Sequence, residues 1–257
     1  NILAMQPKPA WIVSTNCVKN DKGDVHMNIA ILLSGGQGTR LGGSIPKQYM
    51  EVAGKPIIAF SLRTFEKHRQ VDAIVVVAAE EWKNFIKDLV DREQIKKFAG
   101  FADAGSSRQH SILNGLRKAY EIGAADPDKV IIHDAARPNV TDAIIEACID
   151  GLTEADGVMP ALPLKDTVYM SEDGRMIQSL LNRDFLYAGQ APESFALGKY
   201  YAIQKDMTEE DLGKVRGSSE VAFRNKLKVK IVPGDEHNYK ITTMTDLNKF
   251  KSEMEDK

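Results

Sequence analysis

Residues 33–48 read LSGGQGTRLGGSIPKQ, and an apolar run at residues 29–33, IAILL, leads into them. An apolar run of this length that ends at glycines is typical of a fully buried strand. Glycines leave backbone N–H groups free of neighbouring Cβ atoms, so several can converge on one anion. Arg40 and Lys47 add two cations at short range. The stretch therefore predicts a strand followed by a polyphosphate-binding loop, with contacts from Ser34, Gly35, Gly36 and Gly38.

The glycine pattern of this loop matches neither common phosphate-binding motif. It lacks the Gly-Lys-Ser/Thr ending of the ATPase loop, and its spacing is not Gly-x-Gly-x-x-Gly. A flexible strand-to-helix turn with a solvated Arg40 and Lys47 therefore stays open as an alternative.

The bulk composition narrows the class of protein. The chain has 257 residues, 43% of them apolar, enough for one α/β domain with its own core. A net charge of −2 argues against a general nucleic-acid binder. Two cysteines, Cys17 and Cys148, form no disulfide framework or zinc motif and favour a reducing, cytoplasmic compartment. Since no apolar run approaches the roughly 20 residues that span a bilayer, we expect no membrane segment.

Strand-like and helix-like segments alternate from Met27 onward. Residues 1–26 lack clear periodicity, so we expect an extension of unknown role followed by one domain over residues 27–257. Strands are expected at residues 71–79, 98–105 and 129–133, and helices at residues 54–67, 80–89, 111–122 and 141–151. This alternation predicts an α/β fold with a Rossmann-like, doubly wound, mostly parallel sheet. Ligands bind such sheets at the carboxyl ends of strands.

The pattern changes after Gly157. Strand-like runs at residues 158–164 and 166–170 precede a turn at 171–174 and a return strand at 176–180. We therefore expect a protruding β-hairpin arm at approximately residues 163–186. Its exposed edges favour pairing with a second copy, although an unpartnered surface hairpin remains an alternative.

The string HDAARP at residues 133–138 follows a buried strand. Asp134 is well placed there to hold a divalent cation or a ribose hydroxyl, or simply to cap the next turn. Magnesium normally binds through one or two carboxylates together with substrate phosphates, so a Mg²⁺ site at Asp134 is expected.

Three segments together resemble a known family: residues 35–48, residues 133–138 and NYKITT at residues 238–243. They are similar to the 2-C-methyl-D-erythritol 4-phosphate cytidylyltransferases and the related ribitol 5-phosphate cytidylyltransferases, over roughly residues 27–250. The resemblance implies transfer of CMP from CTP to a polyol phosphate with release of pyrophosphate. It also implies a homodimer in which the arm embraces the second subunit.

The resemblance assigns a role to each matching residue. It implies that Gly105, Ser106, Arg108 and Ser111 read the cytosine, and that Asp134 and Ala135 lie at the nucleotide and metal site. It implies that Arg137, Thr167, Arg183 and Lys240 hold the acceptor phosphate, and that Arg40, Lys47, Arg183 and Lys240 are catalytic. From the residues alone, Ser111 fits a helix N-cap equally well, and Thr167 and Arg183 fit surface turns.

The chain departs from the family pattern at three places. Ala191-Pro192-Glu193 stands where Thr-Pro-Gln is usual, Gly217-Ser218-Ser219 where Thr-Asp and a small or acidic residue are usual, and His237 where many members are acidic. Residues 156–167 resemble the methylerythritol enzymes, whereas YAGQ at residues 187–190 resembles the ribitol enzymes. Methylerythritol phosphate, used in isoprenoid precursor synthesis, is the favoured acceptor. Ribitol 5-phosphate for cell-envelope polymers, a uridylyl or guanylyl transferase and a nucleotide-binding module without turnover stay open.

Overall fold

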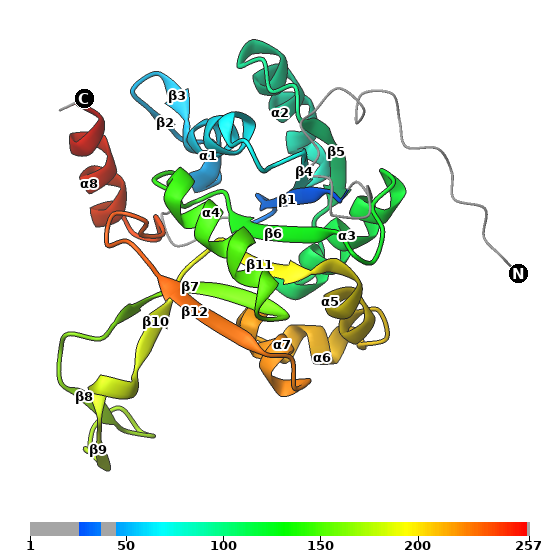
Figure 1. Cartoon of the computed structure of the whole chain (residues 1–257). Helices are drawn as coiled ribbons and strands as arrows, with labels where there is room; N and C mark the ends of the chain where they lie inside the picture. The colour runs from blue at the N-terminus through cyan, green and yellow to red at the C-terminus, as the bar shows by residue number, and fades with distance from the viewer. Residues whose placement is uncertain (1–25, 37–44, 256–257) are drawn as a thin grey trace, which may run out of the picture.

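A computed structural model of the chain describes residues 26–36 and 45–255 (Figure 1). Within them lies an eight-stranded sheet in the order β10-β7-β11-β6-β1-β4-β5, with β12 paired to β7. The strands are β1 (Asn28–Leu33), β4 (Ala73–Ala78), β5 (Phe98–Asp103), β6 (Lys129–Asp134), β7 (Gly157–Pro163), β10 (Tyr187–Gly189), β11 (Glu193–Ala196) and β12 (Val229–Pro233). The α/β, doubly wound and mostly parallel fold predicted from the sequence is confirmed.

Helices cover both faces of this sheet. The first face carries α1 (Ile57–Lys67), α2 (Glu80–Arg92) and α4 (Asp142–Asp150), and the second carries α3 (Arg108–Glu121), α5 (Leu197–Gln204) and α7 (Ser218–Arg224). α6 (Glu209–Lys214) packs on α3, and the C-terminal α8 (Met244–Glu255) packs beside α1. Short 3-10 helices lie at Lys47–Tyr49, Gly151–Thr153 and Arg183–Phe185. None of these helices is long and apolar enough to cross a bilayer.

β1 shows why an unbroken apolar run belongs at the centre of the sheet. Ile29 and Ile31 enter the core shared with α3, whereas Ala30 and Leu32 enter the core shared with α1 and α2. All four side chains are fully buried. Because successive side chains of a strand point to opposite faces, a strand covered on both sides must be apolar at every position.

The strand order places the expected site at the point where the winding reverses. β1 pairs in parallel with β4 on one side and with β6 on the other, so that Leu33 lies opposite both Val77 and Asp134. From the end of β1 the chain crosses to β4 on one side of the sheet centre, whereas from the end of β6 it crosses to β7 on the other side. In sheets of this kind a crevice opens at that reversal, beyond the carboxyl ends of the strands.

The helix expected at residues 54–67 begins later than predicted, at Ile57. Residues 51–56 instead form a small hairpin of β2 (Glu51–Val52) and β3 (Lys55–Pro56). Its two central residues, Ala53 and Gly54, have φ values of 49° and 73°. Two consecutive left-handed residues are the signature of a two-residue hairpin turn, and the Ala-Gly pair did not reveal it.

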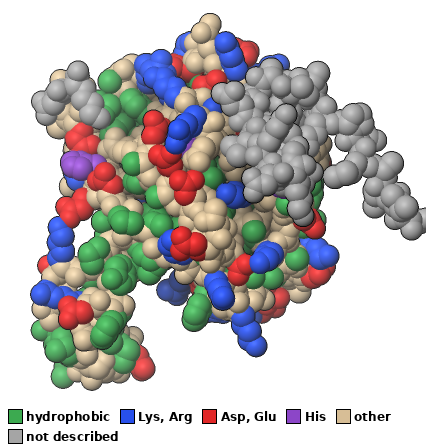
Figure 2. Space-filling view, viewed as in Figure 1, with side chains coloured by type: hydrophobic (Ala, Val, Ile, Leu, Met, Phe, Trp, Pro, Cys, Tyr) green, Lys and Arg blue, Asp and Glu red, His purple; other side chains and the backbone are tan. Residues whose placement is uncertain are grey.

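The expected hairpin is present as a two-stranded sheet of its own, β8 (Val168–Met170) and β9 (Ser179–Leu181), which projects from the body in Figure 1. The return strand starts at Ser179 rather than residue 176, because Asp173 Oδ1 accepts the backbone N–H groups of Arg175 and Met176 and lengthens the turn. Figure 2 shows hydrophobic side chains along this projection. Its exposed apolar residues are Tyr169, Met170, Met176, Ile177, Leu180, Leu181 and Phe185, and the exposed Tyr187 follows in β10.

Candidate active site

A cleft of about 560 Å³ opens where the ends of β1 and β6 meet the start of α3. Its described lining combines backbone-rich loop residues with charged side chains. The lining residues are Leu33, Gly35, Gly36, Lys47, Gln48, Gly105, Ser106, Ser107, Arg108, Ser111, Asp134, Ala136, Lys240 and Thr242. The structure therefore brings together the ends of β1, β5 and β6, as the topology predicted. Lys240, more than 100 residues beyond the end of β6, joins them in the cleft.

The side chains of Gln48 and Tyr49 hold the start of the glycine loop in place through hydrogen bonds. The side-chain amide of Gln48 donates to the carbonyl oxygens of Ser34 at 2.5 Å and Gly36 at 2.7 Å. Tyr49 donates its hydroxyl to the Ser34 carbonyl at 3.0 Å and stacks on Trp82 at 4.3 Å between ring centroids. These contacts fix the backbone of Gly35 and Gly36 at the cleft wall.

Ser34 does not point into the cleft as a ligand would. Its hydroxyl donates to the Val77 carbonyl at 2.9 Å and lies behind the loop, in contact with Tyr49. Gly38 and Arg40 lie outside the described residues, so their expected roles stay predictions. Gln48, which sequence reasoning missed, directly follows Lys47 in the sequence motif.

Two glycines at the cleft are required by close packing. A Cβ on Gly35 would lie 2.4 Å from the Cβ of Ala104, and one on Gly105 would lie 2.5 Å from the ring carbon Cγ of His110. Both distances are shorter than side chains allow, so only glycine fits. The loops after β1 and β5 are thereby packed against each other at one side of the cleft.

The α3 helix begins at the cleft and is capped by Ser107, not by Ser111. Ser107 Oγ accepts the backbone N–H of His110, and the helix starts at Arg108. Ser111 lies one turn further on, where its hydroxyl accepts the N–H of Gly105 at 2.9 Å. Ser111 thus shapes the loop that carries Gly105, Ser106 and Ser107, while its side chain still lines the cleft.

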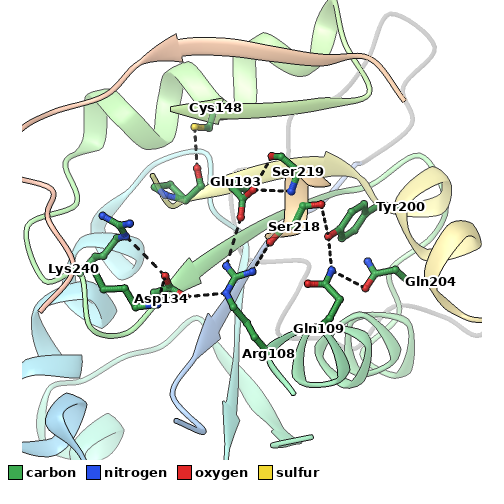
Figure 3. A network of polar contacts seen from close by, with 12 residues as sticks. Arg108, Gln109, Asp134, Cys148, Glu193, Tyr200, Gln204, Ser218, Ser219 and Lys240 are labelled. Carbon is green, nitrogen blue, oxygen red and sulfur yellow. Dashed lines mark hydrogen bonds and ion pairs between the residues drawn. The ribbon is translucent and has the colours of Figure 1, made fainter. Parts of the chain in front are cut away.

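Three cations lie around Asp134 at the end of β6, and Figure 3 labels two of them, Lys240 and Arg108. Lys240 Nζ lies 2.9 Å from Oδ2, Arg108 Nε lies 3.3 Å from Oδ1, and Arg137 Nε lies 3.8 Å from Oδ2. Burial alone would raise the pKa of Asp134, but Arg108 and Lys240 outweigh burial and hold the pKa far below its usual range. The carboxylate is therefore ionised at any pH near neutrality.

Arg137 and Ala135 lie at the edge of this cluster. Arg137 Nη1 donates to the Asn238 carbonyl at 2.6 Å, and burial lowers the pKa of its guanidinium despite the nearby Asp134. Ala135 is fully buried and donates its N–H to the Leu33 carbonyl at 3.0 Å. The neighbouring Ala136 lines the cleft instead of Ala135. The hydrogen bond from Arg137 to Asn238 thus holds in place the segment that contains Lys240.

Thr167 and Arg183 are not brought to this cleft within their own chain. Both are exposed residues at the base of the arm, and Arg183 donates to the carbonyl of Lys165. Among the predicted acceptor-binding residues, only Lys240 lines the cleft, whereas Arg137 lies just behind Asp134. Neither Thr167 nor Arg183 is among the described residues that line the cleft.

Asp134 is the one carboxylate among the described lining residues. No cluster of three or more His, Cys, Asp or Glu side chains occurs in the described part of the chain. This donor set fits the sparse kind of magnesium site, in which one carboxylate and substrate phosphate oxygens share the ion. It does not fit an all-protein metal cage.

A doubly wound sheet with a glycine loop at its switch point, and a cleft lined by Lys47, Lys240 and one carboxylate, fits an enzyme of the nucleotidyltransferase class. The sequence profile of the 2-C-methyl-D-erythritol 4-phosphate cytidylyltransferase family (IspD) matches residues 28–255. The chain belongs to this family, as the sequence predicted, and is a cytidylyltransferase.

Individual relatives carry two names. A 2-C-methyl-D-erythritol 4-phosphate cytidylyltransferase from Geobacter metallireducens is 37% identical over 221 residues, covering 85% of this chain and 93% of the relative. A ribitol-5-phosphate cytidylyltransferase from Streptococcus agalactiae serotype Ia is 32% identical over 227 residues, covering 88% and 95%. Both names describe cytidylyl transfer to a polyol phosphate.

Solved structures agree with the fold. The 4-diphosphocytidyl-2C-methyl-D-erythritol synthase from Anaerococcus prevotii superimposes with a TM-score of 0.76 at 26% identity, covering 90% of this chain and 96% of the other.

Proposed function

We propose that this enzyme transfers CMP from CTP to 2-C-methyl-D-erythritol 4-phosphate. The observation that carries the proposal is the cleft that Lys47, Lys240 and Asp134 line beside the glycine loop, because it offers cations for two phosphate groups at once. The match of residues 28–255 to the family supports cytidylyl transfer to a polyol phosphate. The choice of methylerythritol phosphate rests on the resemblance of residues 156–167 to the methylerythritol enzymes.

In this reaction an acceptor phosphate oxygen forms a bond to the α-phosphorus of CTP. The bond from that phosphorus to the bridging oxygen breaks, and pyrophosphate leaves with the electron pair. A phosphate monoester is already an anion near neutral pH, so the reaction needs no serine, cysteine or histidine nucleophile. Catalysis then consists of positioning and charge stabilisation.

The cleft residues divide these tasks. The amides of Gly35 and Gly36, together with Lys47, would hold the triphosphate, and Arg108, Ser106 and Ser111 line the side where the cytosine and ribose would lie. Lys240 would orient the acceptor phosphate from its place beside Asp134. Asp134 would hold Mg²⁺, and the bound ion would neutralise charge that develops on the phosphate oxygens.

We propose a homodimer in which each arm reaches the cleft of the other subunit. The arm exposes a row of large apolar side chains, including Met176 at 70% and Phe185 at 79% exposure. Surfaces of this kind mark interaction sites. Thr167 and Arg183, which do not reach their own cleft, would then complete the acceptor site of the partner. The scarcity of cysteine supports a cytoplasmic location.

A pyrophosphate-release assay tests the proposal. The purified chain is incubated with Mg²⁺ and CTP, UTP or GTP, each with methylerythritol 4-phosphate or ribitol 5-phosphate. The expected result is the highest kcat/KM with CTP and methylerythritol 4-phosphate. Faster turnover of ribitol 5-phosphate would show that the enzyme is a ribitol-5-phosphate cytidylyltransferase, the second candidate function, which the Streptococcus agalactiae relative supports. Tight CTP binding without pyrophosphate release from either acceptor would instead indicate a nucleotide-binding module.

A further inference from the structure

Glu193 is a buried acid for which the proposed reaction has no task. It is 7% exposed at the start of β11, at one of the positions where the sequence departs from the family pattern. Its Oε1 accepts the backbone N–H of Ser219 at 2.8 Å and the Ser219 hydroxyl at 2.6 Å. Its Oε2 faces Arg108 Nη2 at 3.4 Å. A buried carboxylate with a fixed set of partners has a defined position.

The sheet register puts Glu193 on the same face as Asp134. Glu193 lies opposite Ile132 on the neighbouring antiparallel strand β6, and Asp134 follows two residues after Ile132. Residues two apart on a strand share a face, so Glu193 and Asp134 are diagonal neighbours. Ile132 packs in the core shared with α3, so this face looks toward the start of α3, where Arg108 is located.

The guanidinium of Arg108 is divided among three acceptors (Figure 3). Nη1 donates to Ser218 Oγ at 2.7 Å, Nη2 faces Glu193 Oε2 at 3.4 Å, and only Nε faces Asp134, at 3.3 Å. Burial would lower the pKa of Arg108, but the two carboxylates outweigh burial and raise it. Arg108 is therefore a permanent cation whose two terminal nitrogens point away from Asp134.

The sharing of the Arg108 nitrogens among three acceptors affects Asp134, because an arginine beside a lone carboxylate prefers a bidentate contact with both oxygens. Such a contact would occupy Asp134 Oδ2, which Lys240 Nζ now approaches at 2.9 Å. With Nη1 and Nη2 held by Ser218 and Glu193, Arg108 reaches Oδ1 alone. Oδ2 then stays with Lys240, with Arg137 Nε further away at 3.8 Å, and Asp134 lines the cleft.

We propose that Glu193 is a positioning residue of the nucleotide site. By binding one terminal nitrogen of Arg108, Glu193 prevents Arg108 from contacting both oxygens of Asp134. One of these oxygens then remains available to Lys240 and the bound nucleotide. Ser218 assists from the second terminal nitrogen, and Ser219 fixes the Glu193 carboxylate. The departures at Glu193, Ser218 and Ser219 are thus one connected group rather than three separate losses. This inference rests on the proposed CTP site.

The test is a double-mutant cycle between Glu193 and Arg108, measured as the Kd of CTP without acceptor and as kcat and KM for each substrate. Glu193→Gln is expected to raise the Kd and KM of CTP about tenfold while the KM of the acceptor changes less than about twofold. In an Arg108→Gln background the same change is expected to alter the Kd of CTP by less than about twofold. Arg108→Lys serves as the background if Arg108→Gln binds CTP too weakly to measure.

Ser218→Ala tests the positioning of Arg108 in a second way, because it removes the acceptor of Arg108 Nη1 without removing a buried charge. Its effect on the Kd of CTP is likewise expected to disappear in the Arg108 background. Glu154→Gln is the matched control: Glu154 is an exposed acid paired with Lys230, and its loss should leave every parameter unchanged. Thermal midpoints of all variants report any purely structural effect separately.

Equal losses in both backgrounds, equal changes in both KM values, or wild-type behaviour of Glu193→Gln and Ser218→Ala would each overturn the inference while leaving the proposed function intact. If the wild-type chain bound no CTP, the proposed function and this inference would fall together.

Discussion

At the scale of single residues, the main feature of the cleft is the number of cations around Asp134. Lys240 and Arg108 face the two oxygens of Asp134, and Arg137 is 3.8 Å from one of them. Three cations beside two carboxylates, Asp134 and Glu193, leave one net positive charge, which a triphosphate or an acceptor phosphate can compensate. This imbalance is what distinguishes a site that receives anions from a structural ion-pair network.

Lys240→Met is expected to lower kcat/KM by about a hundredfold, because one cationic contact in a preorganised site stabilises the transition state by about 3 kcal/mol. The stability of the fold should change little, since the Lys240 side chain is partly exposed. Lys251→Met, on the exposed side of α8, is the control and should retain full activity. Turnover by Lys240→Met within threefold of the wild type would contradict this role.

At the scale of elements, the sequence predicted what periodicity or glycine spacing encodes. Runs such as 29–33 and 71–79 are apolar because both faces of their strands are covered, and this pattern is visible without coordinates. No helix was predicted over residues 197–224, because α5, α6 and α7 have only eight, six and seven residues, too few for a clear period. Short helices of this kind are specified by tertiary contacts rather than by their own pattern.

The site was only partly predictable for the same reason. Gly35, Gly36, Lys47, Asp134 and Lys240 stand in recognisable strings, and the structure brings them to one cleft. Glu193 was noticed only as a mismatch, since its link to Arg108 spans 85 residues and depends on the antiparallel insertion of β11. Gln48 shapes the loop through its side-chain amide, a role that residue type alone does not reveal.

The cap of α3 gives a prediction at this scale. Ser107→Ala is expected to lower the free energy of unfolding by about 1 kcal/mol, because it removes the acceptor of the His110 N–H. Ser106→Ala changes the exposed neighbour and should alter stability by less than about 0.5 kcal/mol. Urea unfolding of both variants measures the difference. Equal effects would show that the helix does not begin where Ser107 caps it.

At the scale of the whole molecule, Cys148 reports opening of the fold. Its thiol is fully buried on α4 and faces the Pro192 carbonyl, and burial raises its pKa to about 12. At pH 8 its thiolate fraction is then roughly a thousandfold below that of an unfolded cysteine. In a Cys17→Ser chain we expect a disulfide reagent to modify Cys148 completely in guanidinium but negligibly in buffer. Rapid labelling of the native chain would contradict this burial.

The arrangement of two subunits gives the last prediction. In the proposed dimer, Lys240 acts in its own cleft, whereas Arg183 acts through the arm in the cleft of its partner. Lys240→Met and Arg183→Ala should therefore each be nearly inactive alone. A hybrid of the two variants, however, contains one cleft with its own Lys240 and an intact arm from the partner.

Mixing equal amounts of the two variants, with exchange of subunits, should therefore restore about a quarter of wild-type activity, because half of the dimers are hybrids with one complete cleft of two. Light scattering establishes the dimer and native mass spectrometry the hybrid fraction. Mixing Lys240→Met with Lys240→Met/Arg183→Ala is the control, since no hybrid of these chains contains an intact Lys240. If hybrids form and activity is not restored, the two residues serve the same cleft within one chain, and the arm does not exchange catalytic groups between subunits.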